Sequence, residues 1–273
     1  MFRRSLFNSA LAATLLVGVA GAQQQQPDFS KVEIKSEKLA DNLYMLTGQG
    51  GNMALLVGDT GPLLVDDQFA PLAPKITTAI AALSPKPVRF LVNTHFHGDH
   101  SGGNEAFGKA GAVIVAHDNT FKRLATEQVS GLTGAKSPPQ PPEGWPVITF
   151  ADSASLHVNG EDVEAVHVAN AHTDTDAIIY FKKSNVVHTG DVFAGPAYPF
   201  IDTGSGGSLD GVIAGTATVF ARIDDNTKII PGHAPMQKKA DLEAFRKMLI
   251  EVRERIAREI RAGKTQEQVV AVT

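Results

Sequence analysis

The sequence predicts a mixed α/β protein, built as a sandwich in which strands and helices alternate along the chain. Two observations support this. Short apolar runs bounded by Gly and Pro are interleaved with segments of helical periodicity, and one pattern of elements occurs twice. The chain has 273 residues, of which 43% are hydrophobic, so it can bury one substantial core. This length allows one or two domains.

The first 22 residues have the pattern of an export signal. The basic start "MFRR" precedes the apolar run "ALAATLLVGVAGA", which ends in small residues and is followed by "QQQQPD". The run is too short for a secure membrane span. We therefore expect residues 1–22 to be a cleaved signal peptide and residues 23–273 to be one domain, located in the periplasm or secreted. The export route stays open, and an uncleaved membrane anchor is the alternative.

Charge and cysteine content exclude several functions. The formal net charge of −4 becomes −6 without Arg3 and Arg4, the only charged residues in 1–22. An acidic protein offers no basic surface for nucleic acid. The sequence has no Cys, so disulfides, cysteine-based zinc sites and cysteine catalysis are all ruled out.

The periodic segments give the individual elements. "MALLVGDTGPLLVDD" (53–67) predicts two strands joined by a turn, and residues 72–83 have the apolar spacing of a helix. "RFLVN" (89–93) and "AVIVA" (112–116) are typical of buried strands. A long amphipathic helix is expected from Asp241 to Arg261, just before Gly263, with its apolar positions at Phe245, Met248, Leu249, Val252 and Ile256.

The second half of the chain repeats the order of the first. The first half consists of residues 53–67, a helix and "RFLVNTH" (89–95). The matching segments of the second half are "DAIIYFKKSNVVHTGD" (176–191), a helical stretch at 209–221 and "TKIIPGH" (227–233). Each half reads strand, turn, strand ending in Asp, helix, strand ending in His. Such a duplication would bring both sets of strand ends to one edge of a sandwich. A chance similarity between two α/β segments is the alternative.

Two irregular segments are candidates for loops beside a binding pocket. "KSPPQPPEGWP" (136–146) holds five prolines and Trp145, and "DTGSGGS" (202–208) is rich in Gly and Ser. Both could be plain spacers. We favour loops that flank a pocket, with Trp145 as an aromatic wall.

The stretch "THFHGDHSGG" (94–103) collects groups that bind metals. His95 and His97, two residues apart at a strand end, can point to the same side. Asp99 and His100 follow Gly98, which permits a sharp turn. Imidazole and carboxylate groups are good zinc ligands, but one segment cannot close two coordination spheres. Further candidates lie where strands meet loops, namely His172, Asp191 and His233.

"THFHGDH" resembles the HxHxDH signature of the metallo-β-lactamase superfamily. "AHTDTD", "HTGDVF" and "IIPGH" are similar to the later motifs of that family and occur in the same order, so the resemblance covers about residues 40–235. It implies a four-layer αββα sandwich with a dinuclear metal centre, usually two zinc ions per chain. By motif, the first metal would be held by His95, His97 and His172, and the second by Asp99, His100 and His233, with Asp191 bridging.

The resemblance implies hydrolysis of a small-molecule ester, lactone, thioester or β-lactam by a metal-bound hydroxide, with Asp99 and Asp191 as the catalytic carboxylates. Zinc lowers the pKa of bound water from about 15.7 to about 7. Asp99 could also orient the nucleophile or relay a proton. Asp66 and Asp67 are expected to support the ligands rather than to bind metal. A metal-binding or redox-accessory protein without hydrolytic turnover is the alternative.

The sequence departs from several branches of the family. Asp191 stands where the Cys-containing β-lactamases have a cysteine, and the next lysine is only Lys228, so the expected holder of a drug's carboxylate is missing. Glyoxalase II carries an added helical region, and the di-iron branch has a carboxylate where His97 stands. β-Lactamase activity is therefore possible but need not be the main activity.

The remaining four histidines lie outside these motifs. His157 and His167 are expected at the surface or in satisfied structural positions. His188 is expected to be structural, with a role near Asp191 as the alternative, and His117 is expected to be structural rather than part of the pocket.

Overall fold

The computed structural model describes residues 28–131 and 134–271. The expected signal segment, residues 1–22, lies outside these ranges, so its cleavage stays a prediction. Among the described residues, no helix is both long and apolar enough to cross a bilayer.

The first sheet carries the N-terminal half of the chain. In spatial order its strands are β1 (Lys35–Lys38), β2 (Leu43–Thr47), β3 (Met53–Leu56), β4 (Leu63–Val65), β5 (Phe90–Val92), β6 (Val113–His117) and β9 (Ile148–Phe150). β1 to β4 pair antiparallel, whereas β4, β5, β6 and β9 run parallel. The helices of this half are α1 (Ala73–Ala81), α2 (Gly98–Ser101), α3 (Asn104–Lys109) and α4 (Asp118–Leu124).

The second sheet carries the C-terminal half. Its order is β10 (Ser153–Val158), β11 (Glu161–His167), β12 (Ala177–Phe181), β13 (Val186–His188) and β14 (Lys228–Ile230). Only the β13–β14 pair is parallel. The helices of this half are α5 (Leu209–Arg222), α6 (Lys239–Arg261) and α7 (Gln266–Val270). A small hairpin of β7 (Gln128–Val129) and β8 (Lys136–Ser137) stands apart from both sheets.

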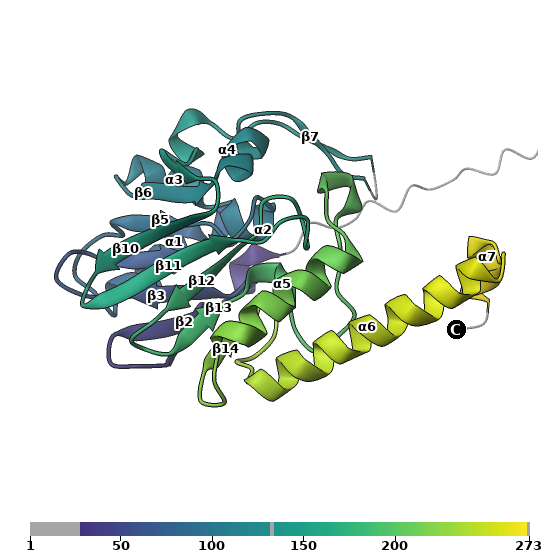
Figure 1. The fold of residues 1–273 in the computed structure, drawn as a ribbon. Coiled ribbons are helices and arrows are strands. Elements are labelled where there is room, and N and C mark those ends of the chain that lie inside the picture. The colour runs from purple at the N-terminus through teal and green to yellow at the C-terminus, as the bar shows by residue number, and fades with distance from the viewer. Residues whose placement is uncertain (1–27, 132–133, 272–273) are drawn as a thin grey trace, which may run out of the picture.

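The buried apolar residues form three clusters, which lie between the four layers of the fold. One cluster fills the space between the sheets, where Val65 and Val92 of the first sheet join Ile179 and Phe181 of the second. Another cluster packs α1 and α3 on the outer face of the first sheet. The last packs α5 and α6 on the outer face of the second (Figure 1). The fold is therefore the predicted αββα sandwich.

The internal repeat is confirmed by the topology. In each half, an antiparallel strand pair is followed by a helix and then by a strand parallel to the second strand of the pair. The elements are β3, β4, α1 and β5 in the first half, and β12, β13, α5 and β14 in the second.

Asn52 connects the two sheets by hydrogen bonds at the edge where these strands end. Its side-chain amide donates to the carbonyl oxygens of Pro231 and Ala234, at 2.8 and 2.7 Å, and its backbone N–H donates to that of Gly232.

The last helix differs from the sequence prediction in its packing. α6 begins at Lys239, two residues earlier than expected, and its predicted apolar positions are buried only near its start, at Phe245 and Leu249. Ile256 is 39% exposed, because the helix runs past the end of the sheet (Figure 1). Gly263, with φ of 77°, follows its end as expected, but α7 was not predicted.

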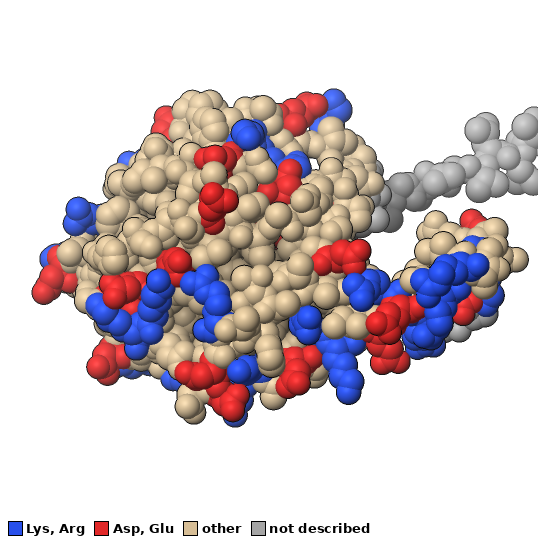
Figure 2. Space-filling model, viewed as in Figure 1, with Lys and Arg blue, Asp and Glu red and all other residues tan. Residues whose placement is uncertain are grey.

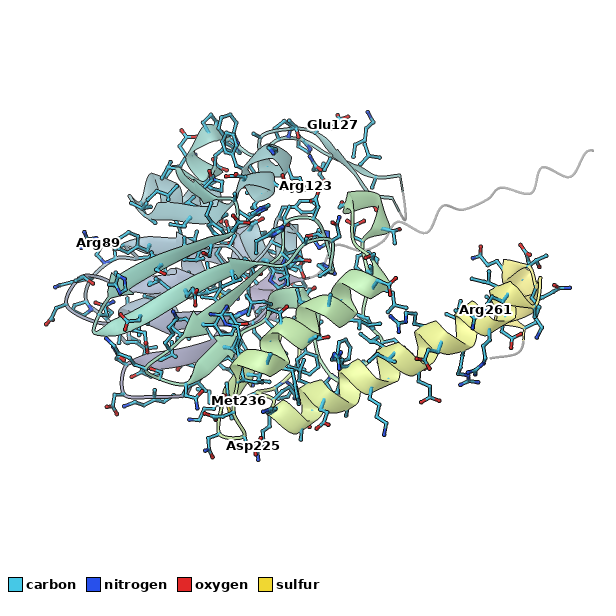
Figure 3. All side chains as sticks on the ribbon, viewed as in Figure 1. Arg89, Arg123, Glu127, Asp225, Met236 and Arg261 are labelled. Atoms are coloured by element: carbon cyan, nitrogen blue, oxygen red, sulfur yellow. The ribbon has the colours of Figure 1, made fainter. Side chains whose placement is uncertain are left out.

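The part of α6 that extends beyond the sheets is highly charged. Figure 2 shows basic and acidic side chains mixed along it, and Figure 3 places Arg261 near its end. Charges of both signs are also interspersed over the rest of the face shown in Figure 2.

We expect the two ends of α6 to contribute very differently to stability. Phe245→Ala should lower the free energy of unfolding by about 3–5 kcal/mol, because the ring is buried and packs 4.9 Å from the Phe193 ring, centroid to centroid. Ile260→Ala, at a side chain 62% exposed, should change it by less than about 0.5 kcal/mol. Urea unfolding of both variants measures this. Equal losses would contradict the packing described.

Candidate metal centre

All seven predicted ligands meet at the edge where the repeated strands end. His95 and His97 follow β5, and Asp99 and His100 lie in α2. His172 precedes β12, Asp191 follows β13, and His233 follows β14. Their side chains form three overlapping groups whose ligand atoms lie within 4.8 Å of one another. The groups are His95–His97–His172, His95–His100–Asp191 and Asp99–His100–His233.

The first group consists only of imidazoles. Nδ1 of His97 lies 2.9 Å from Nε2 of His172, and the His95 ring lies within 5 Å of both rings, centroid to centroid. Nε2 of His95 is fully buried and has no hydrogen-bond partner among the described residues. A buried polar nitrogen without a partner is costly unless something else satisfies it.

The group of Asp99, His100 and His233 includes a carboxylate. Nε2 of His233 lies 3.2 Å from Nε2 of His100 and 3.3 Å from Oδ2 of Asp99. Asp191 lies between this group and the all-imidazole group, because its oxygens lie 3.3 Å from the inner nitrogens of His100 and His233 and 3.7 Å from that of His172. This position is the one a bridging carboxylate needs.

Hydrogen bonds on the outer side of three rings define their tautomers. His100 Nδ1 lies 2.7 Å from a carboxylate oxygen of Asp66, and His172 Nδ1 lies 2.8 Å from the carbonyl oxygen of Phe200. His97 Nε2 lies 3.1 Å from Oδ2 of Asp202. A carbonyl oxygen and an ionised carboxylate accept hydrogen bonds but cannot donate them, so each of these three nitrogens carries a proton.

His95 is oriented in the same way through a hydroxyl. The Thr94 hydroxyl donates to Asp66 at 2.7 Å, so it accepts from Nδ1 of His95 at 3.1 Å. With one proton on each ring, the inner nitrogens of His95, His97 and His172 are therefore left with a lone pair. Outer partners of this kind are typical of metal-binding histidines.

These lone pairs fit a bound cation. The facing nitrogens of His97 and His172, 2.9 Å apart, cannot hydrogen-bond to each other, because both of their protons are on the opposite sides of the rings. Without a cation they would repel. Around a tetrahedral zinc ion with Zn–N bonds of about 2.0–2.1 Å, two ligand nitrogens would lie about 3.3 Å apart. The arrangement is therefore close to that of a coordinated site.

Burial keeps His95 and His172 in the neutral form that binds metals. Burial lowers the pKa of His172 to about 4 and, together with the neighbouring imidazoles, holds the pKa of His95 well below its usual value. Burial opposes ionisation of Asp191, but positive charge on the adjacent His100 nevertheless holds the pKa of Asp191 well below the usual range. Burial also opposes protonation of His100, but the carboxylates of Asp191, Asp99 and Asp66 raise its pKa well above the usual value. At neutral pH His95 and His172 are neutral imidazoles and Asp191 is an ionised carboxylate.

Two glycines allow the backbone to approach the ligands closely. A Cβ atom on Gly51 would lie 2.2 Å from the His100 ring, and one on Gly232 would lie 1.9 Å from Oδ1 of Asp191. Gly98, by contrast, has no left-handed backbone and begins the single helical turn α2. The sharp glycine turn expected there is thus replaced by a helical turn.

The two aspartates after β4 support the site, as predicted. Asp66 accepts from the Thr94 backbone N–H and hydroxyl and from His100, and Asp67 accepts from the Gly103 N–H at 2.8 Å. Both are fully buried.

None of the four other histidines belongs to the clustered groups. His157 is exposed beside Asp162, and His117 stacks on His167 with ring centroids 3.6 Å apart. His188 is buried and lies 2.9 Å from the Asn52 carbonyl oxygen, while its other ring nitrogen accepts from the Gly190 N–H, so it supports the loop of Asp191.

The irregular segments do flank a pocket, but Trp145 is not its wall. Ser137, Pro138 and Gln140 from one segment and Asp202 and Ser205 from the other line the same cavity. Trp145 instead packs against Phe121 and donates from its ring N–H to the Gln140 carbonyl oxygen. The aromatic residues that line this cavity are Phe96 and Phe200.

Comparison with known proteins agrees with the geometry. The family model of the metallo-beta-lactamase superfamily matches residues 46–233. Similar proteins include a metallo-beta-lactamase type 2 from Elizabethkingia meningoseptica (26% identity, 64% of this chain and 68% of that protein) and a hydroxyacylglutathione hydrolase from Polaromonas (28%, 67% and 61%). The alpha subunit of a 2,4-dinitroanisole O-demethylase from Nocardioides is 24% identical over 61% of this chain, but the match spans only 48% of that subunit.

Solved structures share the fold. A metallo-beta-lactamase from Pontibacter korlensis superposes with a TM-score of 0.66 at 18% identity, covering 80% of this chain and 99% of the other. One from Erythrobacter litoralis gives 0.61 at 19% identity, covering 80% and 97%.

Asp202 was not predicted as a site residue, and its removal should weaken metal binding. Asp202→Ala takes away the acceptor that orients His97, so we expect the affinity for Zn²⁺ to fall about tenfold to hundredfold. Competition with a chromophoric chelator measures the affinity. Asp210→Ala, at an exposed carboxylate paired with Arg253, is the matched control and should bind as the parent does. Unchanged affinity in Asp202→Ala would show that His97 does not need this partner.

Gly232→Ala should also damage the site without unfolding the chain. The added methyl would collide with Asp191, so the bridging carboxylate must move and metal content after dialysis should drop. Gly98→Ala, where a Cβ meets no atom within 4 Å, should keep its metal. Elemental analysis of both folded variants tests this, and full metal retention by Gly232→Ala would contradict the close approach.

Proposed function

Since this chain belongs to the metallo-beta-lactamase superfamily, we propose that it is a zinc-dependent hydrolase of small molecules. The observation that carries the proposal is the convergence of buried imidazole lone pairs, above all the unpartnered Nε2 of His95 and the facing nitrogens of His97 and His172. A packed core gains nothing from such an arrangement, whereas a bound cation satisfies it.

We propose two zinc ions per chain. His95, His97 and His172 would hold the first, and Asp99, His100 and His233 would hold the second, with Asp191 between them. The overlap of the ligand groups through His95, His100 and Asp191 supports a pair of adjacent ions. Imidazole and carboxylate donors suit zinc, although other first-row metals accept the same donors.

When bound, zinc polarises a carbonyl oxygen and lowers the pKa of water to about 7. The carboxylates of this chain have separate tasks. Asp191 is nearly buried among three imidazoles and balances positive charge at the centre. Asp99 is more open to solvent and faces His233, so it can accept the proton that the attacking water loses and return it to the leaving group.

The open side of the centre favours catalysis over a purely structural role. The side chains of His97, Asp99 and His233 are partly exposed, and that of His233 reaches 36%. Structural zinc sites are closed, whereas catalytic sites keep a position for water or substrate. This argues against the alternative of a metal-binding or redox-accessory protein without hydrolytic turnover.

The scissile bond is proposed to be a carboxylic ester, lactone, thioester or β-lactam. Two of the similar proteins are named as a β-lactamase and as a hydroxyacylglutathione hydrolase, which supports this range. We also propose that the chain is exported and acts in the periplasm or outside the cell, on the basis of the signal-like pattern of residues 1–22.

The central test is metal-dependent hydrolysis by purified residues 23–273. With zinc, the protein should hydrolyse a chromogenic cephalosporin or a simple carboxylic ester, and a chelator should abolish turnover reversibly. Asp99→Ala should lower kcat by at least about a hundredfold because the proton acceptor is lost. Asp59→Ala, at an exposed carboxylate in the β3–β4 turn, is the control.

The outcomes separate the alternatives. Turnover of esters but not of the cephalosporin would leave the hydrolase proposal standing and reject the drug as substrate. No turnover of any ester, thioester, lactone or β-lactam by a protein that holds two zinc ions would reject the hydrolase proposal.

A further inference from the structure

A cavity of about 270 Å³ opens directly beside the metal centre. It is reached past His97, Gly98 and Asp202, which lie on the edge of the centre. The apolar part of its wall is formed by the side chains of Phe96, Leu124, Val129, Pro138 and Phe200. Uncharged polar side chains also line it, namely those of Gln128, Ser130, Ser137, Gln140 and Ser205. Cavities that combine apolar walls with a few polar groups are typical of small-molecule sites.

The β7–β8 hairpin covers the outer side of this cavity. It leaves the end of α4 and reaches toward the segment at 202–206 (Figure 1). The two segments touch at Gly131 and Gly204, where a Cβ built on Gly131 would lie 2.9 Å from the Cα of Gly204. Only glycines allow this approach, so the hairpin and the 202–206 segment together enclose the space next to His97.

The one basic side chain that lines the cavity is already paired with a carboxylate. Arg123 is the only Lys or Arg among the described lining residues, and Figure 3 places it beneath the hairpin. Its guanidinium donates to both carboxylate oxygens of Asp174, at 2.6 and 2.8 Å, and to the side-chain oxygen of Gln128 at 3.0 Å. It also stacks over the Phe96 ring at 5.0 Å.

The acidic side chain that lines the cavity, Asp202, also has hydrogen-bond partners within the protein. Asp202 accepts from His97 and from the Ser205 backbone N–H. The cavity therefore presents aromatic and aliphatic surface but no unpaired cation. A carboxylate placed here would lose hydration without gaining a cationic partner from the lining side chains.

We infer that this cavity binds an uncharged aromatic or alkyl group of the substrate and selects against substrates that carry a carboxylate there. The apolar group would lie between Phe96 and Phe200 while the scissile bond faces the metal centre. Neutral esters, lactones or thioesters are then the preferred class, and carboxylate-bearing β-lactams are poor substrates. This inference rests on the proposed hydrolase function.

The test compares ethyl esters that differ only in the acyl group, with hydrolysis followed by proton release from the zinc-loaded protein. We expect kcat/KM to be at least about tenfold higher for ethyl phenylacetate than for ethyl acetate, because an added apolar group fills the cavity. Ethyl valerate should likewise exceed monoethyl glutarate, which has the same chain length but ends in a carboxylate, by about tenfold or more.

A substitution at the rim checks that the cavity is responsible. Val129 lies in the hairpin and is 53% exposed, so Val129→Lys should fold and should place a free ammonium group at the cavity. The ratio of ethyl valerate to monoethyl glutarate should then fall at least about fivefold through attraction of the carboxylate. Val147→Lys, at a side chain 71% exposed and outside the cavity lining, is the matched control and should keep the parent ratio.

The failure of this inference is distinguishable from the failure of the proposed function. Hydrolysis of all four esters within a factor of two, or preference for monoethyl glutarate, would overturn the inference and leave the hydrolase standing. A ratio that moves equally in Val129→Lys and Val147→Lys would also overturn it. Absence of hydrolysis for every ester, thioester, lactone and β-lactam tried would remove the proposed function itself.

Discussion

The arrangement depends on imidazole lone pairs that point at one another inside the protein. His95, His97 and His172 each carry their proton on the outer nitrogen, because a hydroxyl, a carboxylate and a carbonyl oxygen respectively accept a hydrogen bond there. The inner nitrogens are thereby left bare and close together. Much of the local structure serves this constraint, including the buried Asp66, the helical turn α2 and the close approach of Gly232 to Asp191. All three features place or orient side chains around the position that a bound cation would take.

The repeated topology explains how one chain assembles such a site. A parallel pair in each sheet, β4–β5 and β13–β14, ends at the same edge, so their following residues converge from both halves. Asn52 holds the halves in register. Behind the site, Asp66 and Gln68 have left-handed backbone conformations with φ of 59° and 57°. Such strain is retained where the surrounding structure requires it, commonly at functional sites.

Residues near in sequence or at strand ends were predictable, and residues brought in by loops were not. The apolar periodicity and the repeat predicted the sandwich, and the histidine and aspartate motifs predicted all seven clustered side chains. Asp202 was missed because it lies in a Gly/Ser-rich segment without periodicity, 105 positions from His97. Trp145 was misplaced because composition alone does not say which ring of a loop faces a cavity. Ile256 was expected on the packed face of α6 but is partly exposed, because α6 extends beyond the sheet at that point. The length of helix that the sheet covers depends on tertiary structure and cannot be inferred from the periodicity of the helix alone.

The most direct measurement is a crystal structure of the zinc-loaded protein with anomalous data collected on both sides of the zinc edge. The account predicts two anomalous peaks. One should lie among the inner nitrogens of His95, His97 and His172, and the other among His100, His233 and Asp99, with Asp191 contacting both. A centre without zinc peaks, in which the facing nitrogens hydrogen-bond to each other or to water, would contradict the central claim.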